Sequence, residues 1–300
     1  KRAFSEASFR ESLGGLGDSI VVVADEDLVK VHIHSEHPGD VLGLAMKFGP
    51  LTRIKIENMR EQHAGIVGEG DGGERHGEDK PAKPYGIVAV AAGEGIGEIF
   101  RSLGADEIVT GGQTMNPSTE DIVSAVRRAG AETVFVLPNN SNIILAAEQA
   151  KSLLECRVAV IPTKTVPQGI AALLAFRPDA GAESNEARMN EAAAGVKSGS
   201  VTYAVRDSQY GDLTIRQGEY IGMLDSDIAV TGPRLAEVCK ALLDRMLERG
   251  DEVVTLFEGL EAESAVTDEL MDYLGEKYPE AETERHYGGQ PLYYYWISVE

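Results

Sequence analysis

The spacing of apolar residues changes along this chain, and the change marks two modules separated by a polar stretch. In the first 64 residues the spacing predicts a small α/β domain, with helices at 5–13 and 38–48 and strands at 19–24, 28–34 and 51–59. Residues 65–84 combine glycine, charged residues and two prolines, which leaves little surface to bury. We expect this stretch to be a flexible linker.

From residue 85 onward, short apolar strands alternate with helical patterns. Continuous apolar strands of this kind are typical of a parallel sheet covered on both faces, so we expect a parallel α/β lobe at residues 85–178. Residues 179–300 predict a mixed α/β lobe, in which segments 201–206 and 213–217 form a hairpin. The predicted fold class is therefore α/β, a small domain followed by a two-lobed domain.

The composition narrows the class of protein and its partners. The formal net charge is −21, which argues against nucleic acid and against an anionic membrane surface as partners. No segment is apolar enough for membrane insertion, and the first residues lack a signal-peptide pattern. Cys156 and Cys239 show no disulfide or metal spacing, so we expect reduced thiols in a cytoplasmic protein. The chain begins at Lys1 within helix-like sequence, and we expect a fragment of a longer protein.

Two histidines in the predicted strand 28–34 are the first candidates for chemistry. Alternate strand residues share a face, so His32 and His34 can reach one cation, and imidazole suits zinc. No third ligand is obvious nearby, and Lys30 shares their face. The alternative is an ordinary sheet face with two half-exposed histidines. Spacing alone leaves both interpretations open.

The loops that follow three predicted parallel strands are the second candidate. Ligands of open α/β sheets bind beyond the carboxyl ends of the strands, where such loops gather. Here the loops carry amide and hydroxyl groups and one cation, which can hold a phosphate or carboxylate at helix N-termini; the residues are Gln113, Thr114, Asn116, Ser118, Asn139, Asn140, Asn142, Thr163 and Lys164. The alternative is that these residues only cap helices and shape turns.

Two further motifs have structural alternatives. The glycines at 93, 95 and 97 fail the spacing of a dinucleotide-binding loop, and a tight strand-to-helix turn explains them better. The sequence contains no recognisable motif for binding ATP. The aromatic segment 293–296 favours a core strand over a partner-docking surface.

Several long motifs together resemble a known family. They are Gly-Asp-Ser at 17–19, His-Ile-His at 32–34, Ile-Glu-Asn-Met-Arg-Glu-Gln-His at 56–63, Gly-Gly-Gln-Thr-Met-Asn-Pro-Ser at 111–118 and Gly-Gly-Gln-Pro-Leu-Tyr at 288–293. The chain resembles the middle and C-terminal domains of the fatty acid kinase A subunit. That family is dihydroxyacetone-kinase-like and is also labelled DAK phosphatase.

The resemblance implies a function for the full-length protein. An N-terminal domain of the family binds ATP and magnesium, and the protein phosphorylates fatty acids held by a DegV-type partner, giving acyl phosphate for phospholipid metabolism. His32 and His34 match a proposed zinc or active-site cluster that includes a cysteine lying before Lys1. We therefore expect the isolated fragment not to be a kinase. The histidines would be metal ligands or phosphate-facing groups, and the C-terminal domain would supply docking and homodimer surfaces.

Two other functions stay open. A metal-dependent phosphatase, as the older family label suggests, needs a metal with an open position, and two histidines are a thin basis for it. A non-catalytic scaffold that binds a ligand or partner is the other.

Overall fold

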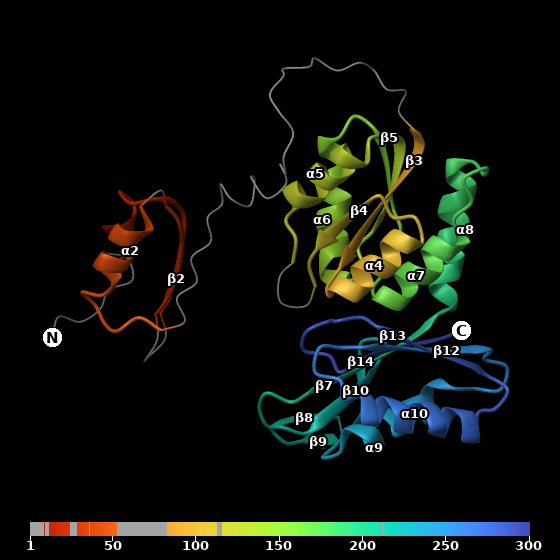
Figure 1. Ribbon diagram of the computed structural model, residues 1–300. Coiled ribbons are helices and arrows are strands. Elements are labelled where there is room, and N and C mark those ends of the chain that lie inside the picture. Colours follow the sequence, from red (N-terminus) through yellow and green to blue (C-terminus); the bar gives the residue numbers. More distant parts are fainter. Residues whose placement is uncertain are drawn as a thin grey trace. The chain divides into compact units, whose positions relative to one another are not determined.

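The computed structural model describes residues 9, 12–24, 29–35, 37–52, 83–112, 116–211 and 213–300. Contacts within the chain divide it into two compact units, Lys1–His76 and Gly77–Glu300. Figure 1 shows the elements of both, and each unit is described here by itself.

The first unit contains a two-stranded antiparallel sheet and a helix. Strand β1 (Asp18–Ala24) pairs with β2 (Val29–His34), and helix α2 (Pro38–Ala45) follows. Proline at the first helical position suits the helix start, because its missing N–H would have no partner there. A small core gathers around Phe9, Leu13, Val22 and Val41. Of the strand predicted at 51–59, only residues 51 and 52 belong to the described part of the chain.

The second unit begins with a parallel sheet, as predicted. Its strand order is β4-β3-β5-β6, and the strands are β3 (Lys83–Ala91), β4 (Glu107–Thr110), β5 (Ala131–Leu137) and β6 (Arg157–Val160). Helices alternate with these strands: α4 (Glu94–Ser102), α5 (Thr119–Ala129), α6 (Ser141–Ala150), α7 (Val166–Ala175) and α8 (Ala182–Gly195), with a 3-10 turn η1 (Lys151–Leu153).

The helices bury both faces of this sheet. Helices α5 and α6 cover one face, and α4 and α7 cover the other (Figure 1). This two-sided burial explains why the strands are continuously apolar. Helix α8, which we expected in the mixed lobe, packs on α7, and its Met189 belongs to the core of the parallel lobe.

The mixed lobe is built on a six-stranded sheet of order β11-β10-β7-β14-β12-β13. Its strands are β7 (Lys197–Tyr203), β10 (Tyr220–Leu224), β11 (Asp227–Gly232), β12 (Val253–Glu258), β13 (Glu282–Tyr287) and β14 (Tyr295–Val299). Strands β12 and β13 are parallel, and the other neighbours are antiparallel. Helices α9 (Leu235–Met246) and α10 (Ser264–Lys277) pack together and share a buried core with the sheet.

The predicted pairing of segments 201–206 and 213–217 is wrong. Strand β7 pairs with β10 and β14, whereas the short β9 (Leu213–Ile215) pairs with β8 (Ser208–Tyr210). Strand β10 offers β7 a register of five consecutive pairs, from Tyr220↔Tyr203 to Leu224↔Gly199. The sequence pattern missed β10 because its central Gly222 interrupts the apolar alternation.

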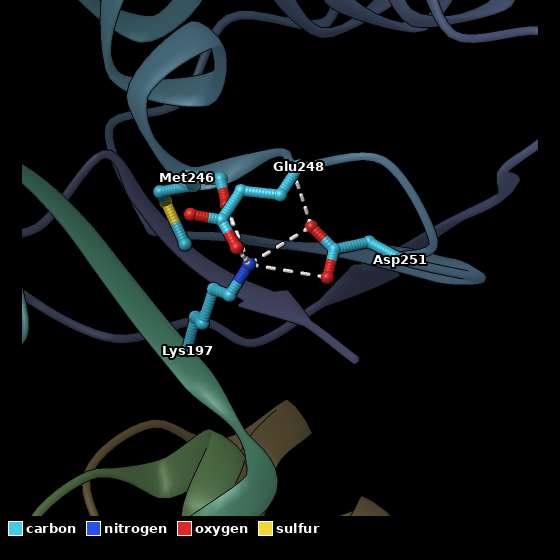
Figure 2. A network of polar contacts seen from close by, with 4 residues as sticks. All are labelled: Lys197, Met246, Glu248 and Asp251. Carbon is cyan, nitrogen blue, oxygen red and sulfur yellow. Dashed lines mark hydrogen bonds and ion pairs between the residues drawn. The ribbon is translucent and has the colours of Figure 1, made fainter.

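An ion-pair network fixes the start of β7 to the end of α9 (Figure 2). The Lys197 ammonium donates to both carboxylate oxygens of Asp251, at 3.1 and 3.0 Å, to Glu248 at 3.1 Å and to the Met246 carbonyl at 3.2 Å. Burial by itself would lower the pKa of Lys197, but hydrogen bonds to Asp251 and Glu248 raise it overall. The lysine is therefore held charged where the mixed lobe begins.

Glycines let the two lobes touch through their backbones. Gly93 is the N-cap of α4 at φ 102°, and the Ile96 amide donates to the Gly288 carbonyl at 3.0 Å. A Cβ at Gly95 would overlap the Tyr287 carbonyl oxygen. The glycine motif at 93–97 is thus a strand-to-helix turn that also seats the 287–290 segment of the other lobe.

Candidate functional site

A pocket of about 220 Å³ opens where the two lobes of the second unit meet. The parallel lobe contributes the loops that follow β5 and β6, at 139–142 and 164–167. The mixed lobe contributes β7, the turn between β10 and β11, and the start of β14. The pocket therefore lies beyond the carboxyl ends of two parallel strands, the usual ligand position in open α/β sheets.

A buried amide network holds the first loop in place. Asn139 Nδ2 donates to the Val90 carbonyl at 2.8 Å, and the Thr163 hydroxyl donates to Asn139 Oδ1 at 2.8 Å. Asn139 adopts φ 55°, a left-handed conformation that asparagine tolerates better than most residues. A Cβ at Gly169 would overlap this amide, so glycine is required there. Asn139 is thus fully engaged in positioning the loop.

Two helices begin at the pocket wall. Asn140 caps α6, because its Oδ1 accepts the Asn142 amide at 2.9 Å, and Thr165 caps α7 by accepting the Gln168 amide at 3.3 Å. The N-terminus of a helix carries partial positive charge and attracts anions. Lys164 adds a full positive charge beside α7. This wall of the pocket therefore favours a negative group.

The mixed lobe supplies the opposite wall. Ser198 on β7 contacts the parallel lobe directly, since its hydroxyl and that of Thr165 lie 2.7 Å apart. Asp225 sits in the β10–β11 turn at φ 53° and brings a carboxylate to the pocket. The rings of Tyr293 and Trp296 pack 5.8 Å apart, and burial raises the pKa of Tyr293.

The structure gathers some predicted site residues and leaves others elsewhere. Asn139, Asn140, Asn142 and Lys164 come together at the pocket, and Thr163 holds Asn139 beside it. Ser118 instead caps α5, in a capping box with Asp121, and Asn116 is exposed beside it. Gln113 and Thr114 lie outside the described residues.

Sequence reasoning missed the pocket residues of the mixed lobe, namely Ser198, Ser200, Asp225 and Ser226. Asp225 and Ser226 form the two-residue turn that joins β10 to β11. Without β10 recognised, that turn had no place in the predicted fold.

His32 and His34 belong to strand β2. The structure describes their backbone but not their side chains. The strand register adds one fact: His34 is the direct partner of Asp18 on β1, and His32 that of Val21. Directly opposite residues of an antiparallel pair share a face. The register therefore places Asp18 opposite His34, with a bulge between Asp18 and Val21. Among the described side chains, no group of three His, Cys, Asp or Glu could hold a metal.

The comparisons with known proteins agree in both sequence and fold. Family models of the fatty acid kinase A-subunit type, described as FakA-like, match residues 1–66 (middle domain) and 86–300 (C-terminal). Protein YloV of Bacillus subtilis is 52% identical over 301 residues, which cover 100% of this chain and 54% of YloV. The chain thus spans about half the length of the curated relatives it matches.

Solved structures show the same fold. A DegV family protein from Corynebacterium glutamicum, Cg2579, has a TM-score of 0.56 at 12% identity, covering 73% of this chain and 97% of that protein. The fatty acid kinase B3 protein of Streptococcus pneumoniae, loaded with linoleic acid, has a TM-score of 0.52 at 11% identity, covering 72% and 99%.

Among the described residues, no helix is both long and apolar enough to cross a membrane.

The two family models together match nearly the whole chain. The chain therefore belongs to the FakA-like family of fatty acid kinase subunits and carries its middle and C-terminal domains.

Proposed function

We propose that this chain is part of a kinase subunit that phosphorylates fatty acids held by a DegV-type binding protein, giving acyl phosphate from ATP. The observation that carries the proposal is the match of both its units to the FakA-like middle and C-terminal domains. In this proposal a separate domain of the longer protein binds ATP and magnesium. The present chain supplies the His-x-His site and the docking surface for the partner and for a second subunit.

A division of labour between this chain and its partner fits the pocket. Pockets for drug-sized ligands measure roughly 300–1,000 Å³, which exceeds the 220 Å³ between the lobes. The second unit shares its fold with a protein that is loaded with linoleic acid, but its own pocket has little room for a long acyl chain. In our proposal the partner carries the acyl chain, and this chain presents docking surfaces.

The β1–β2 sheet is the proposed metal site. Zinc binds histidine nitrogen and carboxylate oxygen, and the register places Asp18 directly opposite His34. The donor types therefore fit zinc, with His32, His34 and Asp18 as ligands from this chain. A bound metal would polarise a phosphoryl or carboxyl oxygen.

Metal analysis tests this site directly. The 300-residue chain should bind zinc in a one-to-one ratio, and His34→Ala and Asp18→Asn should each weaken binding at least about tenfold. His37→Ala serves as the control, because His37 lies beyond the strand. Zinc binding unchanged in His34→Ala would exclude the site.

Activity tests the function. Full-length subunit, mixed with a fatty-acid-loaded DegV-type protein and ATP, should form acyl phosphate, and His32→Ala and His34→Ala should each lower the rate by about 100-fold or more. If both variants keep the wild-type rate, the middle domain acts as a scaffold only. Hydrolysis of phosphate esters by the 300-residue chain, lost in His32→Ala, would instead establish a phosphatase.

A further inference from the structure

The segment between β13 and β14, residues 287–292, adopts a conformation that costs stability. Leu292 has φ 71°, a left-handed conformation that a bulky side chain rarely adopts. Gln290 is fully buried, and its Nε2 donates to the Phe257 carbonyl at 2.8 Å. Its Oε1 accepts no hydrogen bond from the described residues. Backbone strain and a buried acceptor without a donor, two residues apart, are typical of a segment that is held for its function.

Both lobes of the second unit hold the 287–292 segment in place. The Ile96 amide of α4 donates to the Gly288 carbonyl at 3.0 Å, and the Gly288 amide donates to the Glu258 carbonyl at 2.8 Å. At the other end, the Thr202 hydroxyl of β7 donates to the Leu292 carbonyl at 2.7 Å. The backbone of the segment is therefore preorganised, which lowers the entropy lost when a surface binds a partner.

Three exposed apolar side chains lie on or beside the 287–292 segment. Tyr287 is 57% exposed, and Leu292 is 37% exposed in spite of its strained backbone. Leu260 is 61% exposed, and its amide donates to the Gln290 carbonyl at 3.0 Å. Large apolar side chains that gather at one place on the surface indicate an interaction site.

Carboxylates lie around this apolar group. Glu94 is in the first turn of α4, the turn that bonds to the segment, and Glu258 and Glu261 flank Leu260 in the sequence. None of the three forms an ion pair with a described lysine or arginine. A second copy of the chain would bring the same carboxylates to the contact, so like charges oppose self-association here. Charge complementarity instead favours a partner with basic side chains around an apolar centre.

We propose that the 287–292 segment and Leu260 form the docking surface for a protein partner, whose matching face has an apolar centre surrounded by lysine or arginine. The DegV-type binding protein is the occupant we infer. The inference rests on the proposed function, in which that protein carries the acyl chain, and it names the part of this chain that meets it. The strain at Leu292 then has a role, because it holds an apolar side chain outward on a rigid backbone.

Binding to an oleate-loaded DegV-type protein from the same organism tests the surface by biolayer interferometry. Asparagine tolerates the left-handed backbone, so Leu292→Asn removes the apolar side chain and keeps the conformation of the segment. The partner should bind Leu292→Asn and Tyr287→Ser about tenfold more weakly than wild type. Leu153→Asn makes the same change at a 57% exposed position outside this surface, and should bind as wild type does.

Thermal unfolding separates lost binding from lost folding. The melting temperature of Leu292→Asn should stay within about 4 °C of wild type, because relief of the backbone strain offsets the lost apolar contacts. Weaker binding with an unchanged melting temperature assigns the effect to the surface. A melting temperature lowered much further, together with normal binding by Tyr287→Ser, would make Leu292 a structural residue and overturn the proposal.

Charge reversal tests the chemistry of the partner. Glu261→Lys should weaken binding about fivefold and make it less sensitive to salt, because a carboxylate facing basic side chains is lost. Glu132→Lys, at the exposed start of β5, changes the total charge equally and should leave binding unchanged. Tighter binding by Glu261→Lys would mean an acidic partner face and would overturn the proposed chemistry.

The remaining outcomes distinguish this inference from the proposed function. If the wild-type chain binds the DegV-type protein and both Leu292→Asn and Tyr287→Ser bind equally well, the partner docks elsewhere and only this inference fails. If the wild-type chain does not bind that protein at all, the docking role in the proposed function fails with it. If the two variants lose self-association instead, the surface belongs to a second copy of the chain and the proposal is overturned.

Discussion

The two lobes of the second unit bring different kinds of structure to the same pocket. In the parallel lobe, apolar clusters lie on both faces of the sheet, and the helices that cover them start at the carboxyl ends of its strands. In the mixed lobe, α9 and α10 share a core with the sheet, while Phe257 on β12 joins the core of the parallel lobe. The first lobe thus presents helix N-termini, and the second presents strand hydroxyls and a turn carboxylate.

This difference teaches where specificity can arise. The loops after β5 and β6 are fixed by buried groups such as Asn139, so the anion-attracting wall is preorganised. Asp225 lies in an exposed hairpin turn between two half-buried strands, and so is easier to vary. The parallel lobe thus forms the preorganised side of the pocket, and the mixed lobe forms its more variable side.

The largest expected effect separates a fully buried strand position of the parallel lobe from a half-buried one of the mixed lobe. Leu137→Ala on β5 removes a fully buried side chain and should lower the free energy of unfolding by about 2–5 kcal/mol. Leu224→Ala on β10 makes the same change at a half-buried position, and should cost about 1 kcal/mol. Urea denaturation measures both. Equal losses would mean that the two sheets are packed alike and would remove the basis of the comparison.

A pair of helical glycines gives opposite signs. Gly169→Ala on α7 would force the Asn139 amide out of its network, which should cost about 2 kcal/mol because buried polar groups lose their partners. Gly275→Ala on α10 meets nothing within 4 Å and should stabilise the protein by about 0.5–1 kcal/mol. Thermal unfolding of the two variants checks the signs. A stabilising Gly169→Ala would show that Asn139 does not hold the pocket loop.

The same contrast explains how much of the fold the sequence could predict. Every strand of the parallel lobe is recognisable in the sequence, because burial on both faces makes β3 to β6 continuously apolar. In the mixed lobe the pattern misses β10 and β11, since partly solvated strands interrupted by Gly222 carry a weak signal. That omission leads directly to the wrong pairing for β7.

The candidate site was predictable to the same extent. Asn139, Asn140 and Lys164 follow apolar strands, so the general position of parallel-sheet ligands identified them. Ser118 satisfied the same rule, but it caps α5 in a capping box with Asp121, as the Ser-x-x-Asp spacing predicted. Asp225 and Ser198 reach the pocket only through tertiary packing between the lobes, and no local pattern could have indicated them.

A hydrogen bond inside the mixed lobe gives a smaller effect with a clear pH dependence. Tyr295 is fully buried on β14, its hydroxyl lies 2.9 Å from that of Thr267, and burial raises the pKa of Tyr295 to about 12. Tyr295→Phe should cost about 1 kcal/mol at neutral pH. Because the folded pKa is raised, the unfolded chain ionises first, and the wild type loses stability as pH rises from about 10 towards 12. Unfolding measured across that range should show the gap between wild type and variant closing. A gap that stays constant would mean that Tyr295 ionises equally in both states.

The smallest effect concerns the exposed side of the same lobe, where α9 and α10 meet. Asp244 accepts hydrogen bonds from Lys277 and Tyr278 at 2.7 Å and from Tyr273 at 2.6 Å. Burial alone would raise the pKa of Asp244, but these bonds lower it overall. With the folded pKa lowered, the stabilisation is present above the ordinary carboxyl pKa and is lost as pH falls through the folded value.

Asp244→Asn should therefore cost less than about 1 kcal/mol at neutral pH, because the partly exposed pair is screened by solvent. Denaturation at about pH 7 and about pH 3 should show this cost shrinking in acid. If it grew in acid instead, the helix pair would be held by packing and not by this carboxylate, and the mixed lobe would resemble the parallel one more closely than we infer.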